Sequence, residues 1–447
     1  MNRAAIHGSP RLLHLAGTLS LLGWAAMAVA SHRLERPLAV FLGLMAGQWL
    51  VFLIAWRAAR RLEPGRALAA VFGWSVVFLS CGQLAVPLME DDHYRFLWDG
   101  RQLVRTGNPY ATTPAAHFGH EEVSPRFEEI LDHINYPHVP TIYGPVCQYG
   151  FGLSYVLAPG QLWPWKLLVA LAQAGLLLAV IGLARRPRGG RAGGLTPGVV
   201  QAALVIGWCP LLVFETGFNA HPDVLAVALL AAAMGARGRG ALAWCGMLCG
   251  LAVGAKVIAL LLVPFLLMRS VRGWAGLVAG LGAAYAPFWA QGSTADVGAL
   301  ITFAREWEFN SSIYGMLRWL GGPDTARAVC GVTFAGLGGW LWLRWRARLA
   351  LTPGVHPPGL AVFGGFLLLS AVVNPWYLIW LAPFVALRPT ATGLAALALV
   401  SLSYLTGLNL GTPGLDNFEH PAWLRWIEYG GLIAVAAIEA RRWKRSR

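Results

Sequence analysis

The chain has 447 residues, of which 57% are hydrophobic and 13% charged, and its mean hydropathy is +0.55. Soluble domains are about 45–50% apolar, so this composition excludes an ordinary globular domain or a disordered chain and indicates a membrane protein. The net charge of +14 allows a nucleic-acid-binding protein only if the basic residues gather on one surface.

A membrane-spanning helix needs about 20 mainly apolar residues, and such stretches recur along the whole chain. We expect spans at 12–30, 38–56, 67–88, 164–184, 197–216, 223–236, 274–291, 328–343, 359–373, 376–388, 392–408 and 424–440. The apolar block 241–268 is typical of a tight hairpin of two short helices, whereas 146–159 is short enough to be re-entrant or interfacial. The sequence therefore predicts an all-α polytopic helical bundle with about 13–14 crossings, forming a single integral membrane domain over 1–447.

The basic residues follow the expected spans. With the N-terminus in the cytoplasm, most of the Lys and Arg residues fall in cytoplasmic segments, where the only acids are Glu63 and Glu439. Basic excess on cytoplasmic loops is the positive-inside rule. The charge thus reflects topology rather than nucleic-acid binding, and it places both termini in the cytoplasm and the loop 89–145 outside.

Six cysteines lie in or beside apolar segments. Cys245 and Cys249 share one helix face, but no His or further Cys joins them to make the four ligands of a zinc site. We interpret all six as small buried hydrophobes, and no disulfide is implied.

Three adjacent acids, Glu90, Asp91 and Asp92, stand where an apolar run ends. Asp91 or Asp92 can cap a helix over 92–106, which Gly107 would end. Capping needs one acid, and crowded like charges raise one another's pKa, which suits a general base or a cation site.

The helix expected over 92–106 has two faces. Tyr94, Leu97 and Trp98 lie on one, which we expect among the lipid headgroups at the outer interface. Asp92, Arg95 and Asp99 lie on the other.

Further polar elements fall on the same outer side of the membrane. They are NAHPD (219–223), Lys256 at the tip of the 241–268 hairpin, REWEFNSS (305–312), VNPWY (373–377) and LDNFEH (415–420). An ionisable residue inside an apolar block is a candidate functional residue. The alternative interpretations are a snorkelling lysine, an Asp223 helix cap and an interfacial aromatic belt.

The stretch DDHYRFLWDGRQLVRTGNPYATTP resembles the first outer loop of bacterial membrane glycosyltransferases of the GT-C superfamily, in particular the mannosyltransferase-like branch. The segments INYPHVPTIYGPV, NAHPD, AKVIALLLVP, EFNSS and NPWYLIWLAP are similar to later motifs of that family, in the same order.

The resemblance implies transfer of mannose or another hexose from a polyprenyl-phosphate donor to a glycan, glycolipid or protein acceptor. The reaction would invert the anomeric carbon on the outer, periplasmic face of the bacterial cytoplasmic membrane. Asp92 would be the general base, with Asp91 as the alternative, and Lys256, Arg95 and Arg101 would bind the donor phosphate. Further substrate-binding candidates are Asp99, Tyr143, His221, Asp223, Glu306, Glu308, Asn310, Asn374 and Trp376.

Two points stay open at this stage. Some GT-C enzymes use a divalent cation, and Asp91, Glu306 and Glu308 could hold Mg²⁺ or Mn²⁺ here. The competing functions are a transporter or flippase for a lipid-linked or anionic substrate, and a non-catalytic partner in envelope polysaccharide assembly. A transporter would place ionisable residues near the middle of the membrane, often in paired half-repeats.

Overall fold

The computed structural model describes residues 10–33, 38–185, 193–351, 355–406 and 420–445. The described residues are almost entirely helical and contain no strand, which confirms the predicted all-α class. They divide into two compact units, each built from separate parts of the chain. The first unit comprises Met1–Val86, Gln173–Phe218 and Phe309–Arg447, and the second comprises Pro87–Ala172 and Asn219–Glu308.

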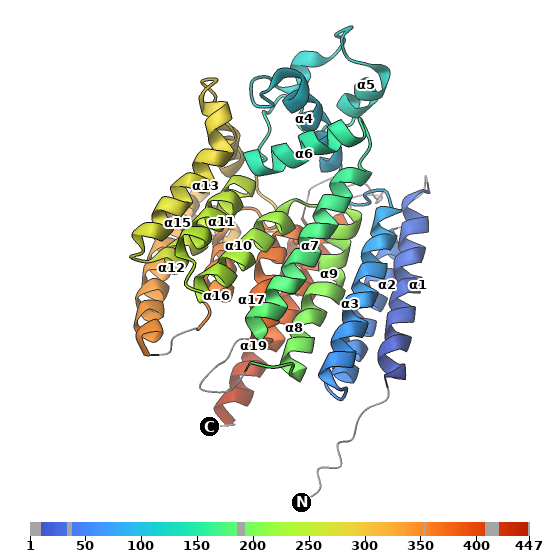
Figure 1. Ribbon diagram of the computed structural model, residues 1–447, viewed down its shortest axis with the longest axis vertical. Coiled ribbons are helices and arrows are strands. Elements are labelled where there is room, and N and C mark those ends of the chain that lie inside the picture. Colours follow the sequence, from blue (N-terminus) through green and yellow to red (C-terminus); the bar gives the residue numbers. More distant parts are fainter. Residues whose placement is uncertain (1–9, 34–37, 186–192, 352–354, 407–419, 446–447) are drawn as a thin grey trace, which may run out of the picture. The chain divides into compact units, whose positions relative to one another are not determined.

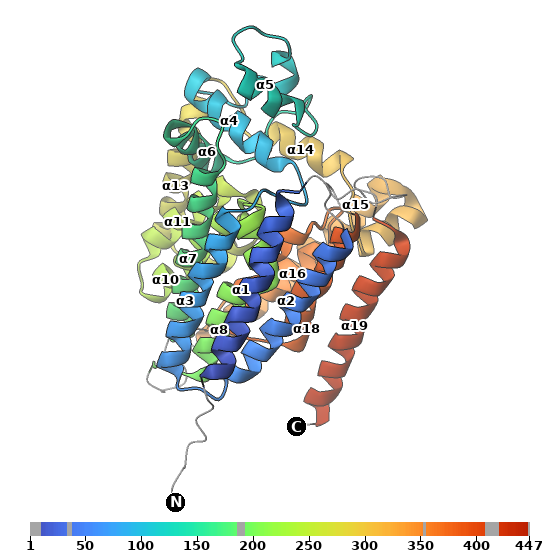
Figure 2. The same ribbon diagram turned by 90° about the vertical axis from the view of Figure 1, so that its right-hand side faces the viewer.

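Apolar helices dominate the first unit. Its helices are α1 (Arg11–Ser31), α2 (Leu38–Ala59), α3 (Pro64–Gln83), α8 (Pro197–Trp208), α9 (Pro210–Leu212), η2 (Val213–Phe218), α15 (Ile313–Leu351), α16 (Gly359–Leu369), η4 (Pro375–Leu381), α17 (Ala382–Leu387), α18 (Ala391–Leu399), η5 (Val400–Thr406) and α19 (Ala422–Arg445). Helices α1, α2, α3 and α8 run alongside one another (Figures 1 and 2). Helix α7 (Trp163–Ala184) belongs partly to each unit.

Within the described residues, six helical stretches are long and apolar enough to cross a membrane. They are Arg11–Ser31, Leu38–Ala59, Pro64–Leu84, Trp163–Ala184, Pro197–Phe218 and Ile313–Leu349. Shorter apolar helices cover three of the other expected spans, at Gly359–Leu369, Pro375–Leu387 and Ala391–Thr406. The chain is thus a multi-pass helical membrane protein, while the predicted number of crossings stays a prediction.

The second unit carries the acidic stretch. Its helices are α4 (Asp92–Thr106), η1 (Pro114–His117), α5 (Pro125–Asp132), α6 (Pro145–Leu157), α10 (Asp223–Gly238), α11 (Leu242–Ala255), η3 (Val257–Leu262), α12 (Val263–Leu267), α13 (Val271–Trp289) and α14 (Val297–Glu306). Helix α4 has the predicted bounds and ends at Gly107, whose φ of 77° is the left-handed conformation that glycine adopts readily. The predicted hairpin over 241–268 is present as α11 followed by η3 and α12.

Glycines let the helices of this unit approach closely. A Cβ added to Gly246 of α11 would lie 1.8 Å from the carbonyl oxygen of Gly273 in α13, and one on Gly100 of α4 would lie 2.4 Å from that of Phe151 in α6. A Cβ on Gly144 would lie 2.3 Å from the carbonyl oxygen of Gly254. Backbone contact at Gly144 therefore holds the start of α6, just after Tyr143, against the end of α11, just before Lys256.

Candidate active site

The first turn of α4 lies directly after the three acids. Asp91 occupies the N-cap position, but its side chain makes no capping hydrogen bond. The capping interpretation therefore does not account for Asp91, while Asp92 is the first helical residue.

The apolar face of α4 differs from the expectation. Leu97 and Trp98 are 8% and 1% exposed, and they pack with Phe127 and Ile130 of α5. The predicted lipid-headgroup face is therefore covered by protein, because α5 supplies an apolar partner that the pattern of α4 alone could not reveal.

Glu90, Asp92 and His221 come together in the second unit although they are far apart in sequence. Each offers a ligand atom, and these atoms all lie within 4.8 Å of one another. Glu90 Oε1 and His221 Nε2 are in direct contact, and both side chains are buried. The two segments are joined by a hydrogen bond from the Leu88 amide to Asn219 Oδ1 at 3.3 Å.

The turn that presents His221 is shaped by local strain. Ala220 has a φ of 60°, an uncommon conformation for a residue with a side chain. The indole of Trp165 donates a 2.8 Å hydrogen bond to the Ala220 carbonyl and fixes this conformation.

Tyr143 connects the acids to the lysine. Its hydroxyl donates a 2.7 Å hydrogen bond to Asp92 Oδ2, and its ring centroid lies 5.9 Å from Lys256 Nζ. Burial and the neighbouring carboxylates of Asp92 and Glu90 raise the pKa of Tyr143 well above its usual value. The phenol therefore remains a hydrogen-bond donor to Asp92 at any physiological pH.

Lys256 interrupts the hairpin between α11 and η3. Its extended backbone, with φ −153° and ψ 121°, breaks the helix, and its ammonium donates a 2.9 Å hydrogen bond to Asp223 Oδ2. Asp223 is fully buried at the start of α10, whereas 21% of the Lys256 side chain is exposed. The ammonium thus has an internal counter-ion and still presents surface to a ligand.

A buried polar network supports Tyr143 from behind. Gln148 donates to Asp99 Oδ2 at 3.0 Å, to Thr141 Oγ1 at 3.1 Å and to the Tyr143 carbonyl at 3.3 Å. Burial raises the pKa of Asp99, against the opposing effect of the Arg95 charge. Asp99 therefore lies where it can position the Tyr143 segment.

The two predicted phosphate-binding arginines have partners in the loop 89–145. Arg95 Nη2 donates to the Val139 carbonyl at 2.6 Å. The Arg101 guanidinium lies 5.0 Å from the Trp98 ring and donates to the Glu122 carbonyl at 3.1 Å. These contacts hold the Arg101 side chain within the loop 89–145. Among the described residues, no contact joins Arg101 to Lys256.

The remaining predicted residues lie elsewhere. Glu306 is exposed at the end of α14, and Glu308 is half-buried just beyond it. Asn310, Asn374 and Trp376 belong to the first unit. Of the segment 415–420, residues 415–419 lie outside the described residues.

The candidate cation ligands also differ from the expected set. Among the described residues, the geometry groups Glu90, Asp92 and His221 rather than Asp91, Glu306 and Glu308. Two carboxylates and an imidazole fit an ion such as Mn²⁺. The sequence pointed to Glu90 only because three adjacent acids are more than a helix cap needs. Its contact with His221 depends on the tertiary fold.

Comparison with known proteins identifies the family of the chain. Residues 9–272, more than half of the chain, match the family described as alpha-(1->6)-mannopyranosyltransferase, N-terminal domain. No curated protein and no solved structure gives a significant match. The chain therefore belongs to the MptA_B family of alpha-(1->6)-mannopyranosyltransferases and is a multi-pass membrane glycosyltransferase.

Proposed function

We propose that the chain transfers mannose, or another hexose, from a polyprenyl-phosphate donor to a hydroxyl group of a glycan, glycolipid or protein acceptor. The observation that carries the proposal is Tyr143, which contacts the Asp92 carboxylate through its hydroxyl and the Lys256 ammonium through its ring. A base and a cation that contact one aromatic side chain suit attack on an anomeric carbon and departure of a phosphate.

In this proposal Asp92 is the general base, with Asp91 as the alternative. The carboxylate takes the proton of the acceptor hydroxyl while the hydroxyl oxygen bonds to the anomeric carbon. The bond from that carbon to the phosphate oxygen breaks on the opposite face, so the configuration inverts. General-base assistance of this kind contributes about 10²–10⁴-fold.

Lys256 stabilises the departing polyprenyl phosphate in the same scheme. The leaving phosphate gains negative charge as the sugar is transferred, and a fixed ammonium stabilises charge that develops in the transition state. Glu90, Asp92 and His221 would hold a divalent cation, which would polarise the acceptor hydroxyl beside Asp92. Arg95 and Arg101 would add positive charge around the site.

The charge distribution supports a site on the outer face of a bacterial cytoplasmic membrane, with both termini in the cytoplasm. Nucleotide sugars are cytoplasmic, which favours a lipid-borne donor. Asp99, His221 and Asp223 would shape the sugar site from the second unit. Glu306, Glu308, Asn310, Asn374 and Trp376 remain proposed substrate contacts.

The test is a transfer assay with the purified protein in liposomes. Radiolabelled polyprenyl-phosphate mannose and radiolabelled GDP-mannose are supplied separately, and the product is analysed for its anomeric configuration. We expect transfer from the lipid donor alone and a configuration opposite to that of the donor. Transfer from GDP-mannose without the lipid, or retention of configuration, would contradict the proposal. Movement of the lipid donor across the bilayer without transfer would instead support a flippase.

A further inference from the structure

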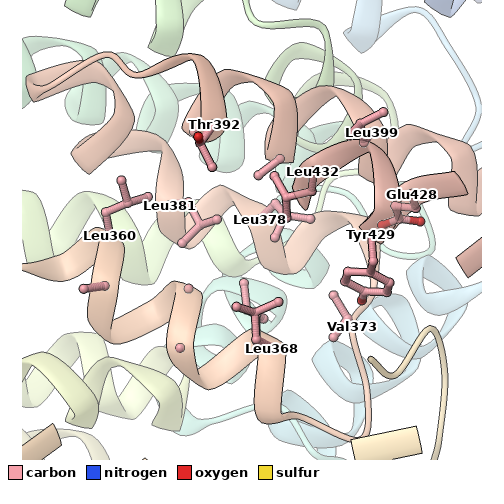
Figure 3. Close-up of a pocket in the computed structure, with 16 residues that line it drawn as sticks. Leu360, Leu368, Val373, Leu378, Leu381, Thr392, Leu399, Glu428, Tyr429 and Leu432 are labelled. Carbon is pink, nitrogen blue, oxygen red and sulfur yellow. The ribbon is translucent and has the colours of Figure 1, made fainter. Parts of the chain in front are cut away.

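An apolar cavity of about 370 Å³ lies within the first unit, among α16, η4, α18 and α19. Its size is within the range of small-ligand sites. Side chains of Leu360, Leu378, Leu381 and Leu432 line it, and Leu360 and Thr392 lie at one end while Glu428 and Tyr429 lie at the other (Figure 3). The cavity is thus an apolar space with one carboxylate end.

The cavity owes part of its space to a glycine. Gly364 of α16 lines it, and a Cβ added to Gly364 would meet no atom within 4 Å. The helices around the cavity are apolar by composition, for example Gly359–Leu369 and Ala391–Thr406. In a membrane, the abundant molecules that match such a space are the hydrocarbon chains of lipids.

Glu428 determines the chemistry of the polar end. It is 5% exposed, and it accepts hydrogen bonds from Asn310 Nδ2 at 3.0 Å and Ser403 Oγ at 3.1 Å. A carboxylate has about four acceptor sites, so two more hydrogen bonds can be accepted from a ligand. Both protein donors are neutral.

His420 does not supply a counter-charge. Its Nε2 lies 3.8 Å from Glu428 Oε2, but burial and the nearby Arg425 lower the pKa of His420 to about 4. The imidazole is therefore uncharged at neutral pH. Asn310 Oδ1 and His420 Nδ1 are buried and make no hydrogen bond within the described part of the chain, so the network has further capacity for a polar group.

We propose that this cavity binds the hydrocarbon chain of a membrane lipid whose uncharged, hydroxyl-bearing head lies against Glu428. A hydroxyl can hydrogen-bond to the Glu428 carboxyl group, whereas a phosphate head would bring a negative charge into a space whose described lining holds no cation. The inference concerns a cavity in the first unit and does not depend on the proposed transferase mechanism.

The experiment measures lipid binding to the purified full chain by native mass spectrometry. The probes are dioctanoylglycerol and dioctanoyl phosphatidic acid, which share their chains and differ in the head. We expect saturable binding of one dioctanoylglycerol, at least about tenfold tighter than phosphatidic acid. Gly364→Leu should fill the cavity and abolish this binding. Gly338→Leu is the matched control, because a Cβ there also meets nothing within 4 Å and Gly338 does not line the cavity.

A second variant tests the head-group selectivity. Glu428→Gln keeps the size of the side chain and removes the acidic group, so it should weaken the preference for dioctanoylglycerol over phosphatidic acid. Thermal unfolding of each variant verifies that it is folded. The proposal is overturned if folded Gly364→Leu binds dioctanoylglycerol like the wild type, if the wild type shows no saturable binding, or if the wild type prefers phosphatidic acid.

Discussion

Two buried polar clusters among the described residues, one in each unit, are built on different principles. In the cluster of the second unit, two buried acids each contact a basic side chain: Glu90 contacts His221, and Asp223 pairs with Lys256. In the first unit, Glu428 is surrounded by neutral donors and an uncharged histidine. Paired charges hold reactive groups in a fixed geometry, whereas a single carboxylate with spare acceptor sites suits the binding of hydroxyl groups.

The family match follows the same division. It ends at residue 272, so it includes Asp92, Tyr143, Asp223 and Lys256 but none of the residues around Glu428. The difference teaches that a buried acid alone does not identify a catalytic site. What distinguishes the second unit is that a cation and a base share one aromatic neighbour.

The largest expected effect on stability comes from breaking a charge pair. Lys256→Met should lower transfer by about 10²–10³-fold, because the leaving phosphate loses its cation. It should also destabilise the protein by about 3–5 kcal/mol, because the buried Asp223 loses its partner. Transfer assays and thermal unfolding in detergent measure the two effects.

A double variant separates folding from function. Lys256→Met with Asp223→Asn removes both charges and should regain most of the stability without regaining transfer. Lys444→Met, in the last turn of α19, is the control for loss of a lysine. If the double variant regained activity, Lys256 would be a structural residue only.

The next effect concerns a buried carboxylate of the second unit that lacks a cationic partner. Burial raises the pKa of Asp296 to about 6, against a hydrogen bond from Tyr285. Because the folded-state pKa is raised, the stability that Asp296 contributes is complete below about pH 4 and is lost as the pH rises through about 6.

Asp296→Asn should therefore raise the free energy of unfolding by about 2–3 kcal/mol at pH 7.5 and change it little at pH 4. Thermal unfolding at the two pH values measures the difference. An equal effect of the substitution at both pH values would contradict this prediction. It would show that the surrounding protein already stabilises the ionised Asp296 carboxylate, as we infer for the paired acids.

A smaller effect tests the connection through Tyr143. Tyr143→Phe removes the hydrogen bond to Asp92 and keeps the ring beside Lys256, so transfer should fall by about tenfold with little change in donor binding. Tyr149→Phe is the control, since the Tyr149 hydroxyl donates a 2.8 Å hydrogen bond to the Ala284 carbonyl in the same unit. Equal losses in both variants would mean that Tyr143 acts through stability alone.

Much of this architecture was predictable from the sequence, for identifiable reasons. Apolar length located most helices to within a few residues, and Gly107 marked the end of α4 as expected. The pattern could not show which partner covers Trp98, because Phe127 lies in a separate short helix.

The site was predictable only in part. The sequence indicated four individual candidate residues and predicted that all of them lie on the same side of the membrane. They are Asp92, Lys256, His221 and Asp223. It could not predict that Glu90 contacts His221, because the two residues are about 130 positions apart in the sequence. Their contact depends on the tertiary fold and on the strained turn at Ala220. Similarly, only the close approach of Gly144 to Gly254 explains why Tyr143 meets Lys256.

The comparison is tested most directly by neutralising one acid in each cluster and measuring transfer from polyprenyl-phosphate mannose at matched protein levels. Asp92→Asn should lower the rate by about 10²–10⁴-fold, as loss of a general base requires. Glu428→Gln should leave the rate within about threefold of the wild type, because a lost neutral-donor hydrogen bond changes the free energy by about 1 kcal/mol. Full activity of Asp92→Asn, with loss of activity in Asp91→Asn or Glu428→Gln instead, would contradict the assignment of the base to Asp92.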